Sequence, residues 1–161
     1  MKGLIFYCCF FAVASIFAQK HLTVDEVIQE WHQAAAEANF EKYTSLMTQD
    51  CVFIGTDASE NWKGEKFLSF AKPYFDNGKA WTFYKLERHI FNESSMNYAW
   101  FDELLDTEMG ICRGSGILEF TENRWKMKHY VLSLAIPNDN IPEIKTLNQA
   151  YNKSFIESLK N

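Results

Sequence analysis

The chain has 161 residues, a formal net charge of −5 at neutral pH and 16% aromatic residues. The acidic balance argues against nucleic acid as a partner, because proteins that bind the phosphate backbone present a basic surface. The length suits one domain with a proper core, and the aromatic residues suffice to fill that core or to line a cavity.

The first residues predict a cleavable secretory signal peptide. Met1-Lys2-Gly3 supplies a short basic end, and the uncharged apolar run over residues 4–17 stops at Ala18-Gln19. This run is shorter than the ~20 residues that a membrane helix needs. We place cleavage after Ala18, with Ala14 as the alternative. The mature chain then has 143 residues and a net charge of −6, since only Lys2 is lost from the charged residues. We therefore expect a periplasmic or secreted protein without a membrane span after processing.

Two cysteines remain after processing, Cys51 and Cys112. An oxidising compartment would permit a bond between them if the fold brings them together. The favoured interpretation, however, is two buried free thiols.

The mature chain opens with three predicted helices and one short strand. Thr23-Val24-Asp25-Glu26 has the pattern of a capping box, and an apolar stripe at three- and four-residue spacing follows it as far as Asn39. A second short helix is expected over residues 40–47 and a strand over residues 51–55. A third helix is expected around residues 67–71, ended or kinked by Pro73.

Beyond Gly78 the pattern changes to strands. Four strand-like runs, at 81–91, 96–107, 111–121 and 125–135, follow one another with short turns and predict an antiparallel meander. Asn140-Ile141-Pro142-Glu143 then starts a tail helix with an apolar stripe. The expected fold is α+β: N-terminal helices packed on a strongly bent, mainly antiparallel sheet, a cone that encloses a cavity. We divide the chain into a signal peptide (1–18), one domain (19–136) and a C-terminal helical tail (137–161).

Two sequence segments resemble the SnoaL-like branch of the nuclear transport factor two-like superfamily. Phe53-Ile54-Gly55-Thr56-Asp57 with Trp62-Lys63-Gly64 is similar to its first strand and connection. Arg113-Gly114-Ser115, with Trp125 twelve residues later and then His129 and Ser133, is similar to its last two strands. The resemblance covers roughly residues 22–136. It implies a cone-shaped fold with a cavity between sheet and helices, and often a dimer through the sheet. It implies no single activity, because members include isomerases, cyclases, dehydratases and binding modules.

The strands carry charged residues that could line such a cavity. Because side chains alternate across a strand, we expect one face to supply the lining. The expected ligand-binding residues are Trp62, Trp100, Asp102, Arg113 and His129. The expected opposite face holds Phe101, Glu103, Cys112 and Tyr130. The guanidinium of Arg113 would bind a ligand carboxylate or enolate, and the aromatic walls a hydrophobic molecule. The alternative for Arg113 is a surface ion pair with Asp106.

The same strands suggest a second function, acid–base catalysis by a carboxylate and a histidine. A turn at Met109-Gly110 would place Glu103 opposite Gly116 and Asp106 opposite Arg113. A turn at Glu122-Asn123 would place His129 opposite Gly116, giving the row Glu103–Gly116–His129. A bulge would give Asp102–Ile117–His129 instead. The catalytic candidates are therefore His129, Asp102 and Glu103.

We expect no metal and no cofactor, because His21, His32, His89 and His129 form no close pair in the sequence. The favoured function is a ligand-binding protein that assembles as a homodimer. The alternative is an enzyme of the isomerase or dehydratase type.

Export is tested by the mass of the mature protein. We expect protein from the extracytoplasmic fraction to begin near Gln19, because the order of basic, apolar and small residues matches a cleavable leader. Intact-mass spectrometry gives the mature N-terminus directly. Cytosolic protein that retains Met1 would contradict export.

Overall fold

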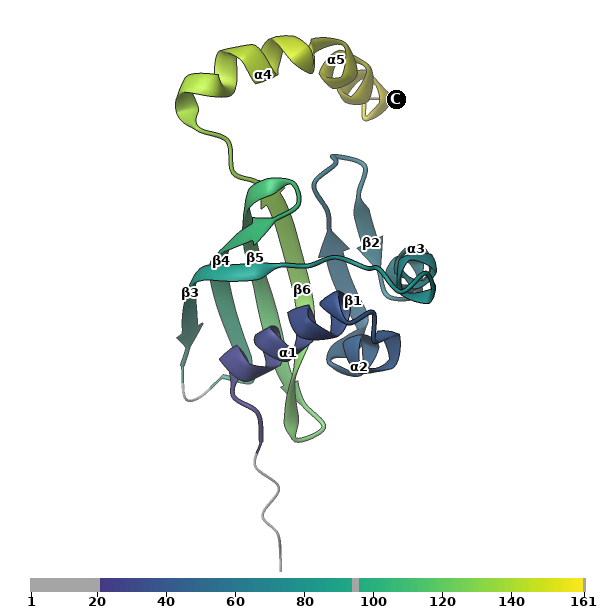
Figure 1. Cartoon of the computed structure of the whole chain (residues 1–161), viewed down its shortest axis with the longest axis vertical. Coiled ribbons are helices and arrows are strands. Elements are labelled where there is room, and N and C mark those ends of the chain that lie inside the picture. Colours follow the sequence, from purple (N-terminus) through teal and green to yellow (C-terminus); the bar gives the residue numbers. More distant parts are fainter. Residues whose placement is uncertain (1–20, 94–95, 161) are drawn as a thin grey trace, which may run out of the picture.

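The structure is a computed structural model that describes residues 21–93 and 96–160. The predicted signal peptide lies outside the described residues. Within them, no helix is both long and apolar enough to cross a membrane. The elements in chain order are α1 (Val24–Ala36), α2 (Phe40–Ser45), β1 (Met47–Ile54), β2 (Asn61–Lys63), α3 (Glu65–Asp76), β3 (Tyr84–Asn92), β4 (Tyr98–Thr107), β5 (Gly110–Thr121), β6 (Arg124–Leu134), the short 3₁₀ helix η1 (Asn138–Asn140), α4 (Ile141–Leu147) and α5 (Gln149–Ser158) (Figure 1).

The start of α1 confirms the predicted capping box. The backbone N–H of Glu26 donates to Thr23 Oγ1 at 3.3 Å, and the N–H of Thr23 donates to the Glu26 carboxylate at 2.7 Å. Asn39, expected as a helix stop, also caps α2 by accepting from the N–H of Lys42 at 3.0 Å. The polar side chains thus satisfy the N–H groups that each helix start leaves unpaired.

Two helix boundaries differ from the prediction. Helix α2 ends at Ser45, and Met47 already belongs to β1, where it pairs with Met127 of β6. Helix α3 continues through Pro73 to Asp76, so of the two predicted effects of this proline, an end or a kink, the end is wrong. Tertiary packing explains the second difference, since Phe67, Ala71 and Phe75 form one buried stripe on both sides of the proline.

The six strands form one sheet in the order β2-β1-β6-β5-β4-β3. The predicted meander is confirmed, since β3, β4, β5 and β6 pair antiparallel in sequence order. β1 joins β6 in parallel, so the sheet is mixed although mainly antiparallel. β2 was not predicted as a strand; it pairs with β1 through Trp62 and Phe53.

The strand registers correct the predicted opposed pairs. The turn between β4 and β5 lies at Glu108 and Met109, so Glu103 faces Gly114 and Asp106 faces Ile111. The Glu122-Asn123 turn is confirmed, with both residues at positive φ, as a tight hairpin turn requires. The pairing of β5 with β6 shifts by one residue between Leu118 and Ile117, and this places His129 opposite Ile117.

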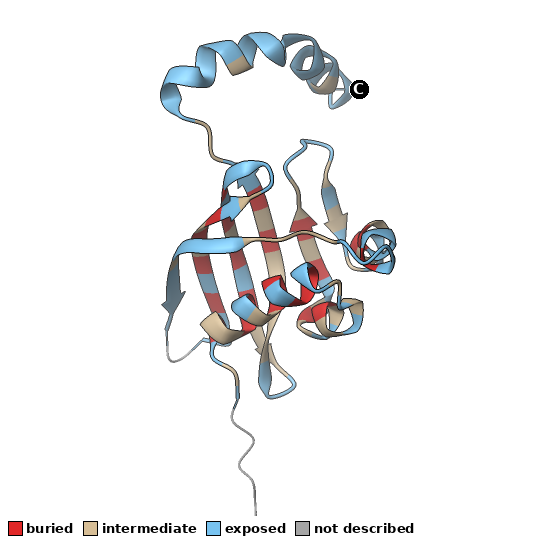
Figure 2. Ribbon diagram, viewed as in Figure 1, coloured by how far each residue is buried: buried red, intermediate tan, exposed pale blue. Residues whose placement is uncertain are grey.

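The core lies between the sheet and α1–α3, which cover one of its faces (Figures 1 and 2). Along β4 the buried residues alternate with more exposed ones, and the buried set faces the helices. Trp31 of α1 is fully buried and packs edge-on against Tyr130 of β6 at 5.0 Å. The buried face of the central strands carries Ala99, Phe101, Glu103, Leu105, Cys112, Leu118, Met127, Tyr130 and Leu132.

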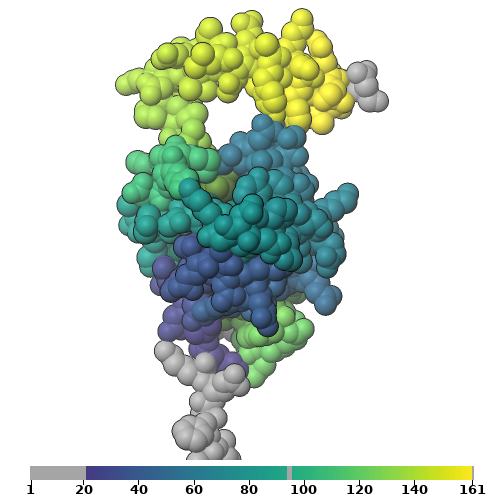
Figure 3. Space-filling model, turned by 45° about the vertical axis from the view of Figure 1, so that its right-hand side comes forward, coloured from purple at the N-terminus to yellow at the C-terminus, as the bar shows by residue number. Residues whose placement is uncertain are grey.

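The C-terminal tail consists of two helices, α4 and α5, rather than the single helix predicted. It lies across one end of the body and exposes most of its apolar stripe (Figures 2 and 3). The hydroxyl of Tyr151 donates to Asp57 Oδ1 at 2.9 Å, in the connection between β1 and β2.

Candidate functional site

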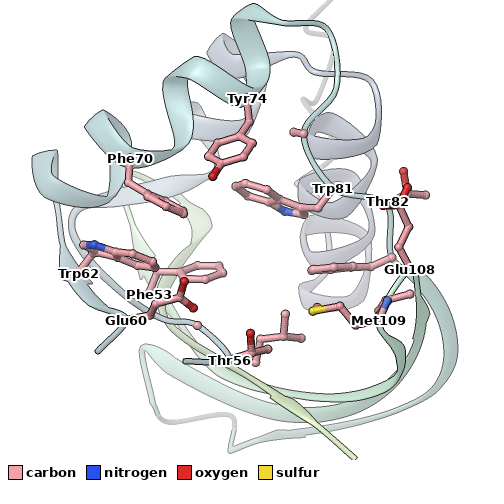
Figure 4. A pocket seen from close by; sticks show the side chains of 15 residues that line it. Phe53, Thr56, Glu60, Trp62, Phe70, Tyr74, Trp81, Thr82, Glu108 and Met109 are labelled. Carbon is pink, nitrogen blue, oxygen red and sulfur yellow. The ribbon is translucent and has the colours of Figure 1, made fainter. Parts of the chain in front are cut away.

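A cavity of about 300 Å³ opens between α3, the segment before β3 and the β1–β2 end of the sheet. Six of its fifteen lining residues are aromatic, and the cavity reaches the connection between β1 and β2 and the turn between β4 and β5. Figure 4 shows Trp62 and Phe70 on one side of the cavity and Trp81 across from them. The aromatic lining residues are Phe53, Trp62, Phe70, Tyr74, Trp81 and Phe83.

The aromatic walls are held by contacts with one another and with the core. The rings of Trp62 and Phe70 stack at 4.2 Å, and Phe53 stacks on the buried Phe67 at 4.4 Å. Trp81 packs edge-on against the buried Tyr43 at 5.7 Å. These contacts fix the rings, so the cavity is preorganised rather than formed by mobile side chains.

The charged groups of the lining are two carboxylates, those of Glu60 and Glu108; no lysine, arginine or histidine of the described chain lines it. Glu60 is half-buried and accepts a hydrogen bond from the N–H of Asp57 at 3.1 Å. Glu108 is largely exposed and lies 3.4 Å from Lys79 Nζ. The cavity is therefore apolar, with negative charge at its edge.

The structure brings one of the five expected ligand-binding residues, Trp62, to this cavity. Trp100, Asp102, Arg113 and His129 do not line it; they lie on the face of the sheet away from the helices, which corrects the expected inner face. Both faces mix apolar and polar residues, so alternation alone could not tell them apart.

The outer-face residues have partners of their own. Trp100 is 44% exposed and stacks on Phe91 at 5.9 Å. Asp102 Oδ1 lies 3.0 Å from His89 Nδ1, and this hydrogen bond raises the pKa of the exposed His89 above its ordinary value. The predicted rows of Glu103 or Asp102 with His129 do not form, because Trp100 and Ile117 occupy the positions opposite His129.

Glu103, the remaining catalytic candidate, is fully buried and has different partners. Its Oε1 accepts from Tyr130 at 3.0 Å and lies 2.8 Å from His32 Nε2. Its Oε2 lies 2.8 Å from Arg88 Nε and 2.7 Å from Nη2. Arg88 in turn contacts Asp25 of α1 at 2.7 Å. We call Glu103, His32, Arg88, Tyr130 and Asp25 the buried network.

Charge and hydrogen bonding keep Glu103 in its carboxylate form. Burial by itself would raise the pKa of Glu103, but the hydrogen bond and charge of His32 and the charge of Arg88 outweigh burial and hold the pKa below its ordinary value. Burial and the nearby Glu103 charge raise the pKa of Tyr130 well above its ordinary value. Tyr130 therefore stays a neutral donor.

Sequence reasoning missed His32 and Arg88, although both carry a signal. His32 follows Ile28 by four residues on the apolar stripe of α1, and Arg88 lies between Leu86 and Ile90 in a strand pattern. A polar residue at an apolar position indicates a buried partner. The sequence does not show which partner, because His32 and Glu103 are 71 positions apart.

The described part of the chain has neither a reactive cysteine nor a cluster of metal-ligating side chains. Cys51 and Cys112 are both buried free thiols, and burial raises the pKa of Cys51 to about 12. A thiol with so high a pKa is a poor nucleophile at neutral pH. Residues 21–93 and 96–160 contain no group of three or more metal-ligating side chains.

The fold, its cavity and the order of elements define a small α+β protein with an aromatic cavity between helices and sheet. The chain belongs to the SnoaL-like domain family, whose model matches residues 24–137. No curated protein matches the sequence.

Solved structures, among them two NTF2-like proteins, share the fold. An NTF2-like protein of unknown function from Pseudomonas putida KT2440 is 13% identical, with a TM-score of 0.60 over 73% of this chain and 87% of that one. A candidate dehydratase of the NTF2-like family from Streptomyces avermitilis is 14% identical, with a TM-score of 0.61 over 71% and 94%. The association domain of C. elegans CaMKII is 18% identical, with a TM-score of 0.57 over 69% and 92%. At these identities the likeness establishes the fold alone.

The buried network predicts a pH-dependent contribution to stability. Replacing Glu103 by Gln should cost about 3–5 kcal/mol at pH 7, because the buried Arg88 loses its buried counter-charge and keeps only the half-exposed Asp25. The folded-state pKa of Glu103 is depressed, so its contribution is present above the ordinary value of 4.5 and is lost as pH falls through the folded value. Urea unfolding of both proteins between pH 3 and 7 measures the difference.

Asp102→Asn is the matched control, since it neutralises the adjacent, half-exposed carboxylate on the outer face. We expect it to change stability by about 0–1 kcal/mol. An equal cost for the two variants, or a Glu103→Gln cost that does not shrink in acid, would contradict the role of the network.

Proposed function

We propose that this protein binds a small, largely apolar organic molecule in the aromatic cavity and acts outside the cytoplasm. The observation that carries the proposal is the cavity itself, about 300 Å³ in volume with six aromatic rings in its lining. This volume lies at the small end of the ~300–1,000 Å³ of ligand pockets, which corresponds to a small organic ligand.

Covering the exposed aromatic surface of the cavity would contribute favourable free energy to ligand binding. Trp62, Phe70 and Trp81 are half-buried: each packs on the core or on a neighbouring ring, and each also lines the cavity. Covering such apolar surface gains about 25 cal/mol per Å² removed from water. Because the rings are already fixed by their contacts, little of this gain is lost to ordering side chains on binding.

The sequence predicted a hydrophobic or a carboxylate-bearing ligand, and the lining of the cavity favours the hydrophobic one. A carboxylate-bearing ligand was expected because of Arg113, and Arg113 lies on the other face of the sheet. The cavity edge carries Glu60 and Glu108 instead. We therefore retain the hydrophobic ligand and do not propose a carboxylate.

We further infer that the sheet bends into a cone around the cavity. Register shifts occur between β1 and β6, between β3 and β4, and between β5 and β6. Such irregularities bend a strand and increase its local twist, which is how an open sheet closes around a space.

A homodimer through the outer face of the sheet is part of the proposal. Exposed large apolar side chains gather there on β3, β4 and β5, namely Phe91, Tyr98, Trp100 and Ile117. A patch of this kind on a soluble protein marks an interface. Light scattering of the mature protein at micromolar concentration should give twice the mass of one chain, and a single-chain mass would exclude the dimer.

The alternative function is an isomerase- or dehydratase-type enzyme with carboxylate–histidine acid–base chemistry. The observation that favours it is the His32–Glu103 contact at 2.8 Å, together with the Phe83 ring that both contacts His32 at 5.5 Å and lines the cavity. Against it, each oxygen of Glu103 is already occupied, so the carboxylate has no free position for a substrate proton. Incubating cavity-bound compounds in D₂O and measuring deuterium uptake by mass spectrometry distinguishes the two functions.

Ligand binding is tested with N-phenyl-1-naphthylamine, a neutral probe whose fluorescence rises in apolar sites. We expect a saturable signal with the mature protein. Trp62→Ala should weaken binding roughly tenfold, about 1.4 kcal/mol, because one aromatic wall is lost.

Trp100→Ala is the matched control, since it also removes a tryptophan but from the outer face. It should leave the affinity within about twofold. Absence of a saturable signal in the wild type, or equal losses in the two variants, would contradict binding in this cavity.

A further inference from the structure

Of the two carboxylates at the edge of the cavity, Glu60 has no counter-charge within the described residues. No lysine, arginine or histidine among residues 21–93 and 96–160 forms an ion pair with Glu60, whereas Glu108 has Lys79 beside it. Glu60 is nevertheless half-buried and takes up part of the cavity wall. A partly buried carboxylate without a cation is costly unless something else compensates it.

The backbone holds the Glu60 carboxylate at the cavity. Its Oε2 accepts from the N–H of Asp57, and the carbonyl of Glu60 accepts from the N–H of Gly55 at 3.0 Å. A side chain at Gly55 would overlap the Glu60 carboxylate, so the glycine provides the space that it occupies. Figure 4 shows this carboxylate beside Phe53 and near Trp62, at the edge of the cavity.

Besides the Glu60 carboxylate, the aromatic rings of the cavity also favour a bound cation. The faces of aromatic rings are negative, and organic cations bind where several faces surround them, with tryptophan the strongest partner. Here Trp62 and Trp81 lie on different sides of the space, and Tyr74 projects its ring and hydroxyl toward it (Figure 4). A neutral ligand would use the rings but leave Glu60 without a counter-charge, and an anion would face two carboxylates.

We propose that the ligand of this cavity is an organic cation, an alkylated or aromatic ammonium compound, held over the rings with Glu60 as its counter-charge. The inference rests on the proposed binding function and adds the charge class of the ligand. The cationic head group lies near Glu60, and its alkyl substituents contact the walls made by Trp62, Phe70 and Trp81.

A series of three compounds of one shape and different charge tests the proposal. Choline is the cation, 3,3-dimethyl-1-butanol is its neutral isostere, and 3,3-dimethylbutyrate carries a carboxylate. Each competes against N-phenyl-1-naphthylamine at constant ionic strength. We expect choline to displace the probe at a concentration at least tenfold lower than the alcohol, and the butyrate to be the weakest.

Two variants locate the charge effect. Glu60→Gln keeps an acceptor for the N–H of Asp57 but removes the charge, so choline should bind roughly tenfold more weakly while the alcohol stays within about threefold. Gly55→Ala keeps the charge but displaces the carboxylate, so it should weaken choline in the same direction. Glu122→Gln, an exposed carboxylate at the β5–β6 turn, is the control and should change neither compound.

The outcomes separate this inference from the function on which it rests. If the probe binds but the alcohol matches or exceeds choline, or choline fails to displace the probe at tens of millimolar, the cation inference is overturned and ligand binding stands. Equal losses of choline affinity in Glu60→Gln and Glu122→Gln also overturn it. If the probe itself does not bind, both fail.

Discussion

The constraint on which the rest of the structure depends is a fully buried carboxylate, Glu103, on β4 beside the edge strand β3. Both of its oxygens must be compensated inside the protein, and the compensating groups come from three other elements: His32 of α1, Arg88 of β3 and Tyr130 of β6. Gly114, directly opposite on β5, leaves the room for them, since a methyl group there would come 2.8 Å from Glu103 Oε1. One side chain therefore fixes how α1 sits across the sheet. Arg88 extends the connection to Asp25 in the first turn of the same helix, where the hydrogen bond from Arg88 lowers the pKa of the aspartate.

The interior has two regions with different chemistry. Around Glu103 every charge has a counter-charge, so this region is complete in itself and suited to holding elements together. Around the cavity, aromatic rings leave space, and the nearest half-buried charge, Glu60, has no cation beside it in the described chain. The first region stabilises the fold, and the second can accept a ligand. His32 and Phe83 mark the boundary between them, with ring centroids 5.5 Å apart.

This separation bears on how SnoaL-like proteins of one fold support different functions. The sheet and its first three helices form a scaffold, and the cavity lies where the β1–β2 connection, the β4–β5 turn and the segment before β3 meet. Residues in connections can change without disturbing the strands, so the part of the lining that lies in connections is freer to vary than the buried face of the sheet. The solved structures at 11–18% identity share this fold with the chain.

The sequence by itself determined the class of fold, most of the helices and the four-strand meander, because these follow from local capping, periodicity and turn chemistry. The prediction placed the β4–β5 turn one residue too late, which moved the pairing of β4 with β5 by two residues. A shift of two residues keeps every side chain on the same face of the sheet. Tertiary structure alone decided which face turns toward the helices, since both faces of β4 carry aromatic and acidic residues. It also decided that β1 pairs in parallel with β6, that Glu103 meets His32 rather than His129, and that Glu60 reaches the cavity. Each of these depends on contacts between residues far apart in the chain, and no local pattern records such contacts.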